Sequence, residues 1–292
     1  MPGLSFEERF IDPRPPGKRP RRAAYALPTL FTAGNIFLGF LAILRAFQGA
    51  LLGNSGNLGS NPHFEFAAKA IGVAVVLDGL DGRIARMTNT VSDFGREMDS
   101  LADVITFGIA PAILAYAWGV QFVLPGGFLR DHRAGYFMAF LYLLCGAVRL
   151  ARFNVQTHPV PKNPGRSDRK YFVGLPIPAG AAMVAAVVYA ADSEPIQWWF
   201  VSMLWLVLLG LLSFLMVSTW RYPSFKQISF SGPRSPLTVI LVGALIYLIW
   251  NFSQPVLLAL ASAYVVSGIV IRAGGIIKRR FRHTPHPEHQ IG

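Results

Sequence analysis

The sequence predicts an all-α fold, a polytopic membrane helix bundle of about eight transmembrane helices with both termini in the cytoplasm. First, 53% of the 292 residues are apolar and only 14% are charged, whereas about a quarter of the residues in a soluble domain are charged. Second, the apolar residues gather in stretches of roughly 17–25 residues, the length that a helix needs to cross the hydrocarbon. Third, the basic residues lie mostly between and beyond these stretches, as membrane topology predicts.

Eight apolar stretches are candidates for the spanning helices. In chain order they are Leu27–Leu52, Phe64–Arg86, Leu101–Leu124, Ala134–Asn154, Gly174–Ala191, Trp198–Val217, Leu237–Asn251 and Val256–Ile271. The seventh is short, and the eighth is bounded by Pro255 and Arg272.

The distribution of Lys and Arg predicts how these spans are oriented. Both tails and the loops after spans four and six are basic, whereas the connections 52–63, 192–197 and 252–254 contain neither Lys nor Arg. Arg130 and Arg133, on the predicted outer side, are exceptions. The positive-inside rule therefore places both tails, and the loops after spans two, four and six, in the cytoplasm. We expect a multi-pass protein of the cell (inner) membrane.

Composition also argues against other classes of protein. The single cysteine, Cys145, excludes an internal disulfide framework and a cysteine-rich metal site. The net charge of +12 and pI near 10.3 are compatible with nucleic-acid binding, but the basic residues follow the topology, so no nucleic-acid partner is expected. Trp198, Trp199 and Tyr222 fit anchoring at the membrane interface.

An acidic cluster interrupts the second and third spans. Asp78 and Asp81 are spaced i, i+3, and Asp99 and Asp103 are spaced i, i+4, so each pair lies on one face of its helix. The pairs flank a short cytoplasmic turn, and antiparallel helices joined there would bring all four carboxylates together. Because a charge at the centre of a span costs roughly 2.5–3.5 kcal/mol, such a cluster indicates function.

The chemistry of four carboxylates favours metal binding. They cannot all stay ionised at close range without cations, and hard oxygen ligands select Mg²⁺, Mn²⁺ or Ca²⁺ over Zn²⁺. Four carboxylates suit two divalent ions about 3.5–4 Å apart, which can clamp a phosphoryl displacement. The simpler alternative is that the acids form ion pairs with Arg83, Arg86 and Arg96.

The residues between the acids are compatible with a nucleotide. Gly82 and Ala85 lie on the face of Asp78 and Asp81, and Gly95 lies one turn before Asp99, so a ligand or helix can approach closely. Arg86 can pair with a phosphate group of the ligand. Ser92 is a short polar residue in the turn, within reach of the nucleotide.

The run from Asp78 to Asp103 resembles the signature of the CDP-alcohol phosphotransferase family at every fixed position: Asp78-x2-Asp81-Gly82-x2-Ala85-Arg86-x8-Gly95-x3-Asp99-x3-Asp103. Further segments resemble the membrane-type phosphatidylserine synthase branch, and the similarity runs from about residue 27 to 226. They are LPTLFTAGNIFLGF from Leu27, FGREMDSLADVITFGIAP from Phe94, RLARFN from Arg149, GLPIP from Gly174 and RYPSFK from Arg221. Thr29 and Met98 depart from that branch, where Asn and Leu are frequent.

This resemblance implies a reaction of CDP-diacylglycerol with L-serine that yields phosphatidylserine and CMP. It implies that Asp78, Asp81 and Asp99 bind metal, and that Asp103 contacts metal and is the base for the serine hydroxyl. The residues assigned to CDP-diacylglycerol are Asn35, Gly82, Ala85, Arg86, Ser92 and Gly95. The resemblance also implies a homodimer.

The acceptor site is predicted from charge. Serine carries a carboxylate, so a cationic partner is expected, and Arg149 and Arg152 at the cytoplasmic end of span four are candidates, with Asn154 as a hydrogen-bond partner. These arginines could instead only end the helix and follow the positive-inside rule. The expected organisation is a basic tail (1–26), a catalytic bundle (27–217), a loop with two extra helices (218–272) and a second basic tail (273–292).

Three rival functions stay open at this point. Another CDP-alcohol phosphotransferase, which makes phosphatidylglycerol phosphate or phosphatidylinositol phosphate, would keep the acids and change the acceptor pocket. A membrane cation transporter would place acids near the middle of the bilayer. An aspartate-rich membrane prenyltransferase would also use Mg²⁺ but would release pyrophosphate instead of CMP.

Overall fold

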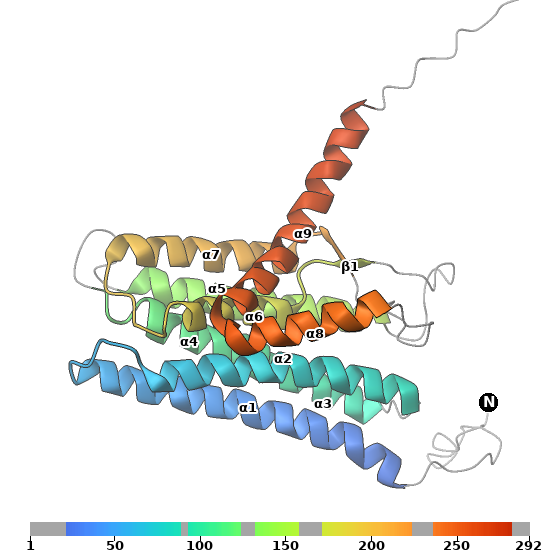
Figure 1. Cartoon of the computed structure of the whole chain (residues 1–292), viewed down its shortest axis with the longest axis horizontal. Helices are drawn as coiled ribbons and strands as arrows, with labels where there is room; N and C mark the ends of the chain where they lie inside the picture. Colours follow the sequence, from blue (N-terminus) through green and yellow to red (C-terminus); the bar gives the residue numbers. More distant parts are fainter. Residues whose placement is uncertain (1–21, 89–92, 124–131, 158–170, 224–235, 282–292) are drawn as a thin grey trace, which may run out of the picture.

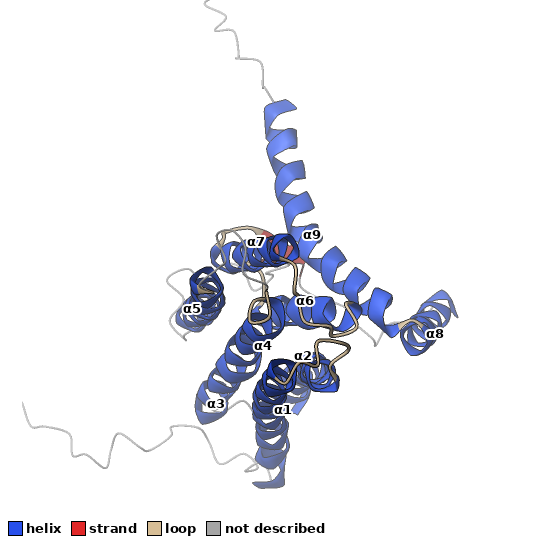
Figure 2. Ribbon diagram, turned by 90° about the vertical axis from the view of Figure 1, so that its left-hand side faces the viewer, coloured by secondary structure: helices blue, strands red, loops and turns tan. Residues whose placement is uncertain are grey.

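The computed structural model describes residues 22–88, 93–123, 132–157, 171–223 and 236–281 (Figure 1). The elements are α1 (Arg22–Asn54), α2 (Pro62–Thr88), α3 (Asp93–Asp103), η2 (Val104–Ile109), α4 (Ala110–Gly119), α5 (Arg133–Thr157), β1 (Tyr171–Val173), α6 (Ile177–Ala190), α7 (Trp199–Val217), β2 (Arg221–Pro223), α8 (Pro236–Asn251) and α9 (Ser253–Phe281). Most helices run along one common direction, whereas α9 crosses the bundle and projects from it (Figures 1 and 2).

The described part of the chain contains five helices that are long and apolar enough to cross a membrane. They are Leu30–Asn54, Phe94–Gly119, Arg133–Val155, Trp199–Val217 and Ser253–Gly274. The predicted spans in α2, α6 and α8 also form helices, but α6 is a shorter apolar helix and α8 has only 16 residues. The chain is therefore a helical, multi-pass membrane protein, as predicted.

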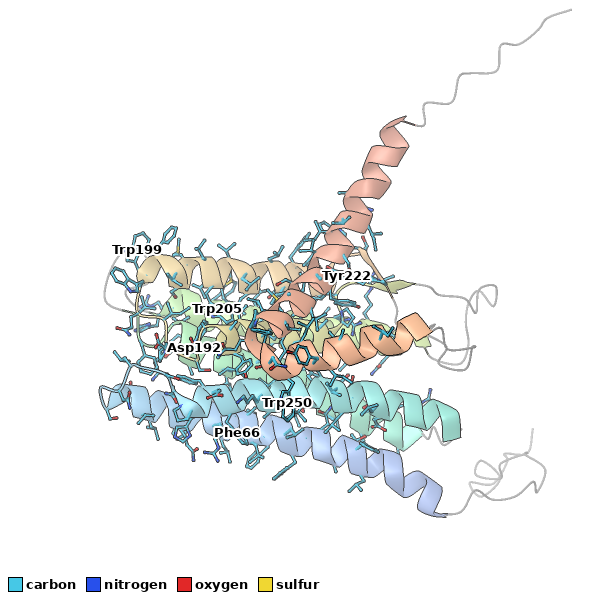
Figure 3. The ribbon with its side chains drawn as sticks, viewed as in Figure 1. Phe66, Asp192, Trp199, Trp205, Tyr222 and Trp250 are labelled. Carbon is cyan, nitrogen blue, oxygen red and sulfur yellow. The ribbon has the colours of Figure 1, made fainter. Side chains whose placement is uncertain are left out.

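The outer surface of the bundle is apolar, which suits lipid and not water. Large side chains such as Phe37, Val207 and Trp250 are 59%, 64% and 88% exposed. Figure 3 shows such side chains projecting outward along the helices, with Trp199 at one end of α7. In a bilayer these groups remain in an apolar medium, so their exposure carries no hydrophobic penalty.

Small residues allow α1 and α2 to pack closely as an antiparallel pair. Ala42 and Ala46 on α1, and Ala67 and Ala74 on α2, are fully buried. The start of α2 is capped by Asn61, whose side-chain oxygen accepts a hydrogen bond from the His63 N–H and whose side-chain nitrogen donates to an α1 carbonyl. This cap directs α2 back along α1 toward the end of the bundle that carries the acids.

The third span contains a π-helical turn, η2, directly after Asp103. The Ala110 N–H donates to the Ile105 carbonyl, five residues back, which is the π-helical pattern. Thr106 donates from Oγ1 to the Asn35 carbonyl over 3.0 Å, and Tyr142 donates from its hydroxyl to the Phe107 carbonyl over 3.2 Å. These bonds fix the irregular turn against α1 and α5.

A short antiparallel sheet, β1–β2, is a departure from the all-α prediction. Phe172 pairs with Tyr222, so the two segments that precede α6 and follow α7 are joined. Gly174 has φ of +79°, and a Cβ there would lie 2.5 Å from the Met216 carbonyl oxygen, so only glycine fits. The sequence pattern missed the pairing because each strand has three residues.

Helix α9 is longer than the predicted span and covers a residue expected at the membrane interface. It begins at Ser253, includes Pro255 in its first turn, and continues past Arg272 to Phe281. Tyr222 is fully buried, and a Cβ on Gly268 of α9 would lie 2.2 Å from its ring. The prediction that Tyr222 anchors the interface is therefore wrong, because α9 packs over the β2 strand.

Candidate active site

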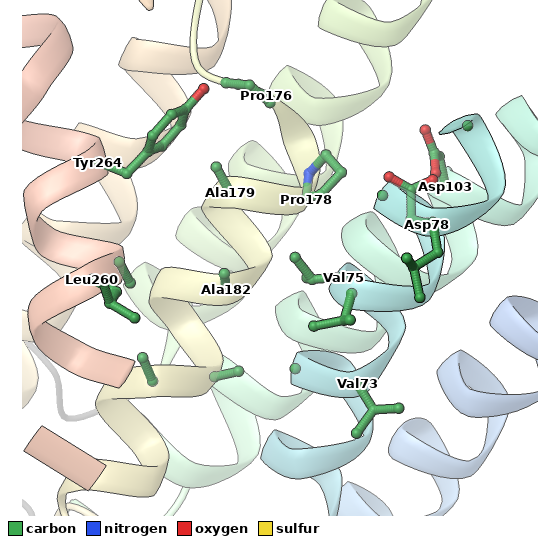
Figure 4. Close-up of a pocket in the computed structure, with 18 of the residues that line it drawn as sticks. Val73, Val75, Asp78, Asp103, Pro176, Pro178, Ala179, Ala182, Leu260 and Tyr264 are labelled. Atoms are coloured by element: carbon green, nitrogen blue, oxygen red, sulfur yellow. The ribbon is translucent and has the colours of Figure 1, made fainter. Parts of the chain in front are cut away.

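Three of the four predicted aspartates converge where α2 faces α3. Asp78, Asp99 and Asp103 each offer a carboxylate oxygen, and these atoms lie within 4.8 Å of one another. Figure 4 shows the Asp78 and Asp103 carboxylates close together at one end of a cavity. The i, i+4 spacing of Asp99 and Asp103 places both on the face of α3 that is directed toward Asp78.

Asp81 lies one helical turn beyond Asp78 and is held by α1. Its Oδ2 accepts a hydrogen bond from Thr32 Oγ1 over 3.1 Å. Its Oδ1 is buried and has no hydrogen-bond partner among the described residues. Asp81 is outside the group of three converging carboxylates but within electrostatic range of Asp78 and Asp99.

Asn35 lies on the same helix, α1, one turn from Thr32. It is only 3% exposed, and its side-chain oxygen is buried without a hydrogen-bond partner among the described residues. Its carbonyl accepts the bond from Thr106 in η2. Asn35 does not line the cavity, so the structure does not place it at the cavity surface with the acids.

A cavity of about 1250 Å³ extends from the acids along the bundle. Asp78, Asp99 and Asp103 line one end, together with Arg96 and Ser100. The rest is mainly apolar: α6 contributes a row of alanines, α2 contributes valines, and α9 contributes leucines. Figure 4 shows α6 between α2 and α9, with Ala179 and Ala182 facing the space between them. The cavity therefore joins a polar end to a long apolar channel.

The end of α5 contributes Arg149 and Asn154 to the polar end. Arg149 is 9% exposed, lines the cavity, and lies within electrostatic range of Asp103. Its Nε is buried without a hydrogen-bond partner among the described residues. Asn154 also lines the cavity, and its side-chain nitrogen donates to Ser100 Oγ over 2.8 Å.

Arg152, by contrast, does not line the cavity. It is exposed, and its guanidinium donates to the Val217 carbonyl at the end of α7 over 3.4 Å. Although Arg152 is only three positions after Arg149 in α5, its long side chain reaches the end of α7 and not the cavity. The structure thus separates the two arginines that charge alone suggested together.

The remaining predicted residues divide into three groups. Gly82 lines the cavity beside Asp78. Gly95 lies in the first turn of α3. Ala85 and Arg86 belong to α2, but only their helical backbone is described, and Ser92 lies outside the described residues.

Sequence reasoning missed Thr32 and every cavity residue from α9. Thr32 had a detectable signal, because Thr32 and Asn35 are polar residues spaced i, i+3 in a mainly apolar stretch of α1. Leu257, Leu260 and Tyr264 had none, because their role depends on how α9 crosses α6. No periodicity within α9 encodes that crossing.

The donor set suits hard divalent cations. Asp81 Oδ1 and Asp103 Oδ1 are both buried without hydrogen-bond partners among the described residues, so their negative charge needs compensation. Three converging carboxylates could hold a metal ion, and oxygen ligands select Mg²⁺, Mn²⁺ or Ca²⁺. A bound cation beside a long apolar channel suits a ligand with a phosphate head and a lipid tail.

Comparison with known proteins agrees with this geometry. A family model described as CDP-alcohol phosphatidyltransferase matches residues 25–209. A CDP-diacylglycerol–serine O-phosphatidyltransferase of Helicobacter pylori is 36% identical over 254 residues, which cover 86% of this chain and 92% of the relative. The protein of that name from Bacillus subtilis is 36% identical over 203 residues, which cover 69% of this chain and 92% of the relative.

An archaeal relative extends the comparison. The archaetidylserine synthase of Methanothermobacter thermautotrophicus is 33% identical over 204 residues, which cover 68% of this chain and 70% of the relative. The region that the family model matches, residues 25–209, contains all four aspartates, Arg149 and the α6 residues that line the cavity. The signature, the site and the relatives agree, and the chain belongs to the CDP-alcohol phosphatidyltransferase family.

Proposed function

We propose that the chain transfers the phosphatidyl group of CDP-diacylglycerol to L-serine, giving phosphatidylserine and CMP. In this reaction the serine hydroxyl oxygen forms a bond to the phosphorus that carries diacylglycerol. The bond from that phosphorus to the bridging oxygen breaks, and CMP leaves with the electron pair. The observation that carries the proposal is the cluster of Asp78, Asp99 and Asp103 at the polar end of an apolar cavity. The serine synthases among its relatives support the acceptor.

The shape of the cavity suits the donor. The pyrophosphate would lie at the acids, beside Gly82, which leaves room for close approach. The proposed contacts of the CDP moiety remain Ala85, Arg86, Ser92, Gly95 and Asn35. The acyl chains would extend along the apolar channel, so that the lipid reacts without leaving the bilayer.

Asp103 is the proposed base and catalytic residue. The serine hydroxyl must lose its proton as it attacks, and a carboxylate within about 2.6–3.2 Å can accept it. Asp103 suits this role because its Oδ1 has no competing hydrogen bond among the described residues. Divalent ions, proposed to be two of Mg²⁺ or Mn²⁺, with Ca²⁺ as an alternative, would neutralise charge on the phosphate oxygens.

The proposed metal ligands are Asp78, Asp81, Asp99 and Asp103. The proximity of three of these carboxylates supports the assignment, and the position of Asp81 one turn further along α2 allows it to complete a second site. We propose direct displacement without a covalent intermediate. Net inversion of configuration at phosphorus is the expected result, and net retention would contradict a single displacement.

Arg149 is the better candidate for the serine carboxylate. It combines burial, a position on the cavity wall and electrostatic proximity to Asp103, which Arg152 lacks. Asn154 would contribute a hydrogen bond from the same helix end. An acceptor held there would have its carboxylate near α5 and its hydroxyl near Asp103.

We further propose that the site faces the cytoplasm of the inner membrane, in a homodimer with eight spans and both termini cytoplasmic. The end of α2, the start of α6 and the start of α8 lie at the same end of the bundle, which supports a common side (Figure 1). The basic residues of the tails and of the loops between these helices favour the cytoplasm. The proposed catalytic bundle is residues 27–217, followed by an added segment, 218–272, between two basic tails (1–26 and 273–292).

The decisive experiment supplies the purified full-length chain with CDP-diacylglycerol, Mg²⁺ or Mn²⁺, and one labelled acceptor at a time. Labelled serine is expected to enter lipid with release of one CMP for each phosphatidylserine formed. Preference for glycerol 3-phosphate or inositol phosphate would instead assign the chain to another activity of the family. Absence of CMP release with every acceptor would contradict phosphatidyl transfer.

A further inference from the structure

Helix α9 forms a wall of the cavity, although it lies beyond the matched region of the family. The match ends at residue 209, whereas Leu257, Leu260, Ala261 and Tyr264 line the cavity. Three of these are aliphatic, whereas Tyr264 carries a hydroxyl group. Figure 4 shows its hydroxyl near Pro176, with α6 between Tyr264 and Asp103.

Tyr264 is oriented by the β2 strand. Its ring lies 5.8 Å from the Tyr222 ring, centroid to centroid, and its hydroxyl donates to the Pro223 carbonyl over 3.4 Å. That bond is long for an O–H donor, whose usual distance is about 2.7–2.8 Å. A charged acceptor would form a shorter and stronger bond with the same hydroxyl.

Arg149 is close enough to interact electrostatically with both Tyr264 and the proposed base, Asp103. The three side chains come from α9, α5 and α3 and line the same cavity. They therefore give one cavity a base, a cation and a neutral donor.

This arrangement matches an amino-acid acceptor. Such an acceptor carries a nucleophilic hydroxyl and a carboxylate only a few bonds apart. A hydroxyl at Asp103 would leave the carboxylate near Arg149, on the side that faces α9. We infer that Tyr264 is an acceptor-specificity residue whose phenol hydroxyl donates a hydrogen bond to the acceptor carboxylate beside Arg149. This inference rests on the proposed function.

The test compares two tyrosines at the same junction. Tyr264→Phe removes the hydroxyl from the cavity, whereas Tyr222→Phe removes a hydroxyl that donates to the Val265 carbonyl over 3.4 Å and does not line the cavity. Tyr264→Phe is expected to raise the KM for serine about tenfold, the size expected for a hydrogen bond to a charged group. The KM for CDP-diacylglycerol should stay within about twofold, and Tyr222→Phe should change neither KM by more than that.

A second acceptor separates recognition from general damage. Ethanolamine has the hydroxyl and amino groups of serine but no carboxylate, so Tyr264→Phe should leave the rate of transfer to ethanolamine equal to that of the unmodified chain. The ratio of kcat/KM for serine to that for ethanolamine should therefore fall. Should Tyr264→Phe not fold, Tyr264→Gln, which keeps a donor, is expected to retain more serine use than Tyr264→Leu.

The outcomes distinguish the two proposals. An unmodified chain that transfers nothing to serine contradicts the proposed function, and the inference with it. An unmodified chain that uses serine, with an unchanged serine KM in Tyr264→Phe, contradicts the inference alone. Equal increases of the serine KM in Tyr264→Phe and Tyr222→Phe would show that the substitutions act by disturbing the docking of α9. That result would also overturn the inference.

Discussion

Thr32 on α1 holds Asp81 on α2 through a hydrogen bond of 3.1 Å between Thr32 Oγ1 and Asp81 Oδ2. The two residues are 49 positions apart, and both are buried. This bond leaves the other Asp81 oxygen without a hydrogen-bond partner among the described residues, and thus available to a cation. A side chain outside the acidic signature therefore orients one of its members.

Replacement of Thr32 by valine should weaken metal activation. Thr32→Val keeps the shape and removes the donor, so Asp81 can rotate away from the site. We expect the Mg²⁺ concentration for half-maximal activity to rise about tenfold, because hydrogen bonds to charged groups contribute roughly 1.5–3 kcal/mol. Thr32→Ser keeps the hydroxyl and serves as the control. Equal activation curves for the valine and serine variants would contradict an orienting role.

Asp103→Asn should remove catalysis without unfolding the chain. The amide cannot accept the proton of the acceptor hydroxyl, and a positioned base contributes about 10²–10⁴-fold to rate. We expect kcat to fall by at least about 10²-fold. Glu194→Gln, an exposed change in the connection between α6 and α7, is the control and should retain normal activity. Retention of more than a tenth of kcat in Asp103→Asn would exclude Asp103 as the base.

Removal of divalent ions should abolish transfer reversibly. The buried carboxylate oxygens of the site need cations for charge compensation. Chelation is expected to reduce CMP release to background, and titration with Mg²⁺ or Mn²⁺ should restore it, while Zn²⁺ should restore less because hard oxygen ligands disfavour it. Undiminished activity after exhaustive chelation would contradict the metal assignment.

Gly39→Ala should destabilise the contact between α1 and η2. A Cβ at residue 39 would lie 2.6 Å from Thr106 Oγ1 and 2.8 Å from the Thr106 Cα, so the backbone must move. Such overpacking costs typically about 1–3 kcal/mol. Gly34→Ala on the same helix meets nothing within 4 Å and is the matched control. Thermal unfolding in detergent should show a lower Tm only for Gly39→Ala; equal Tm values would exclude a tight contact.

The sequence predicted the acid cluster well because its information is local. The spacings of Asp78 and Asp81, and of Asp99 and Asp103, each place a pair on one helix face, and the short connection makes the helices antiparallel neighbours. The structure brings three of the four together within 4.8 Å. Helical periodicity and one turn were sufficient to predict this convergence.

Features that depend on contacts between distant segments were not predictable. The pairing of Phe172 with Tyr222 joins residues 50 positions apart, and each strand is too short to show alternation. The sides on which Arg149 and Arg152 lie depend on the rotation of α5 against its neighbours, which charge does not reveal. The position of Tyr264 likewise depends on the crossing of α9 over α6.

The π-helical turn η2 divides the third span into two helices, α3 and α4, and changes the rotation of one about the span axis relative to the other. In a regular helix one added residue rotates everything after it by about 100° relative to what precedes it. Asp99 and Asp103 lie before η2 and converge with Asp78 of α2, whereas the buried α4 residues Leu114 and Trp118 lie beyond it. Deletion of one residue from η2 would preserve every aspartate in the chain and yet turn them away from the partner helix. The number of residues in η2, as much as the identity of their side chains, therefore keeps the aspartates aligned with the partner helix.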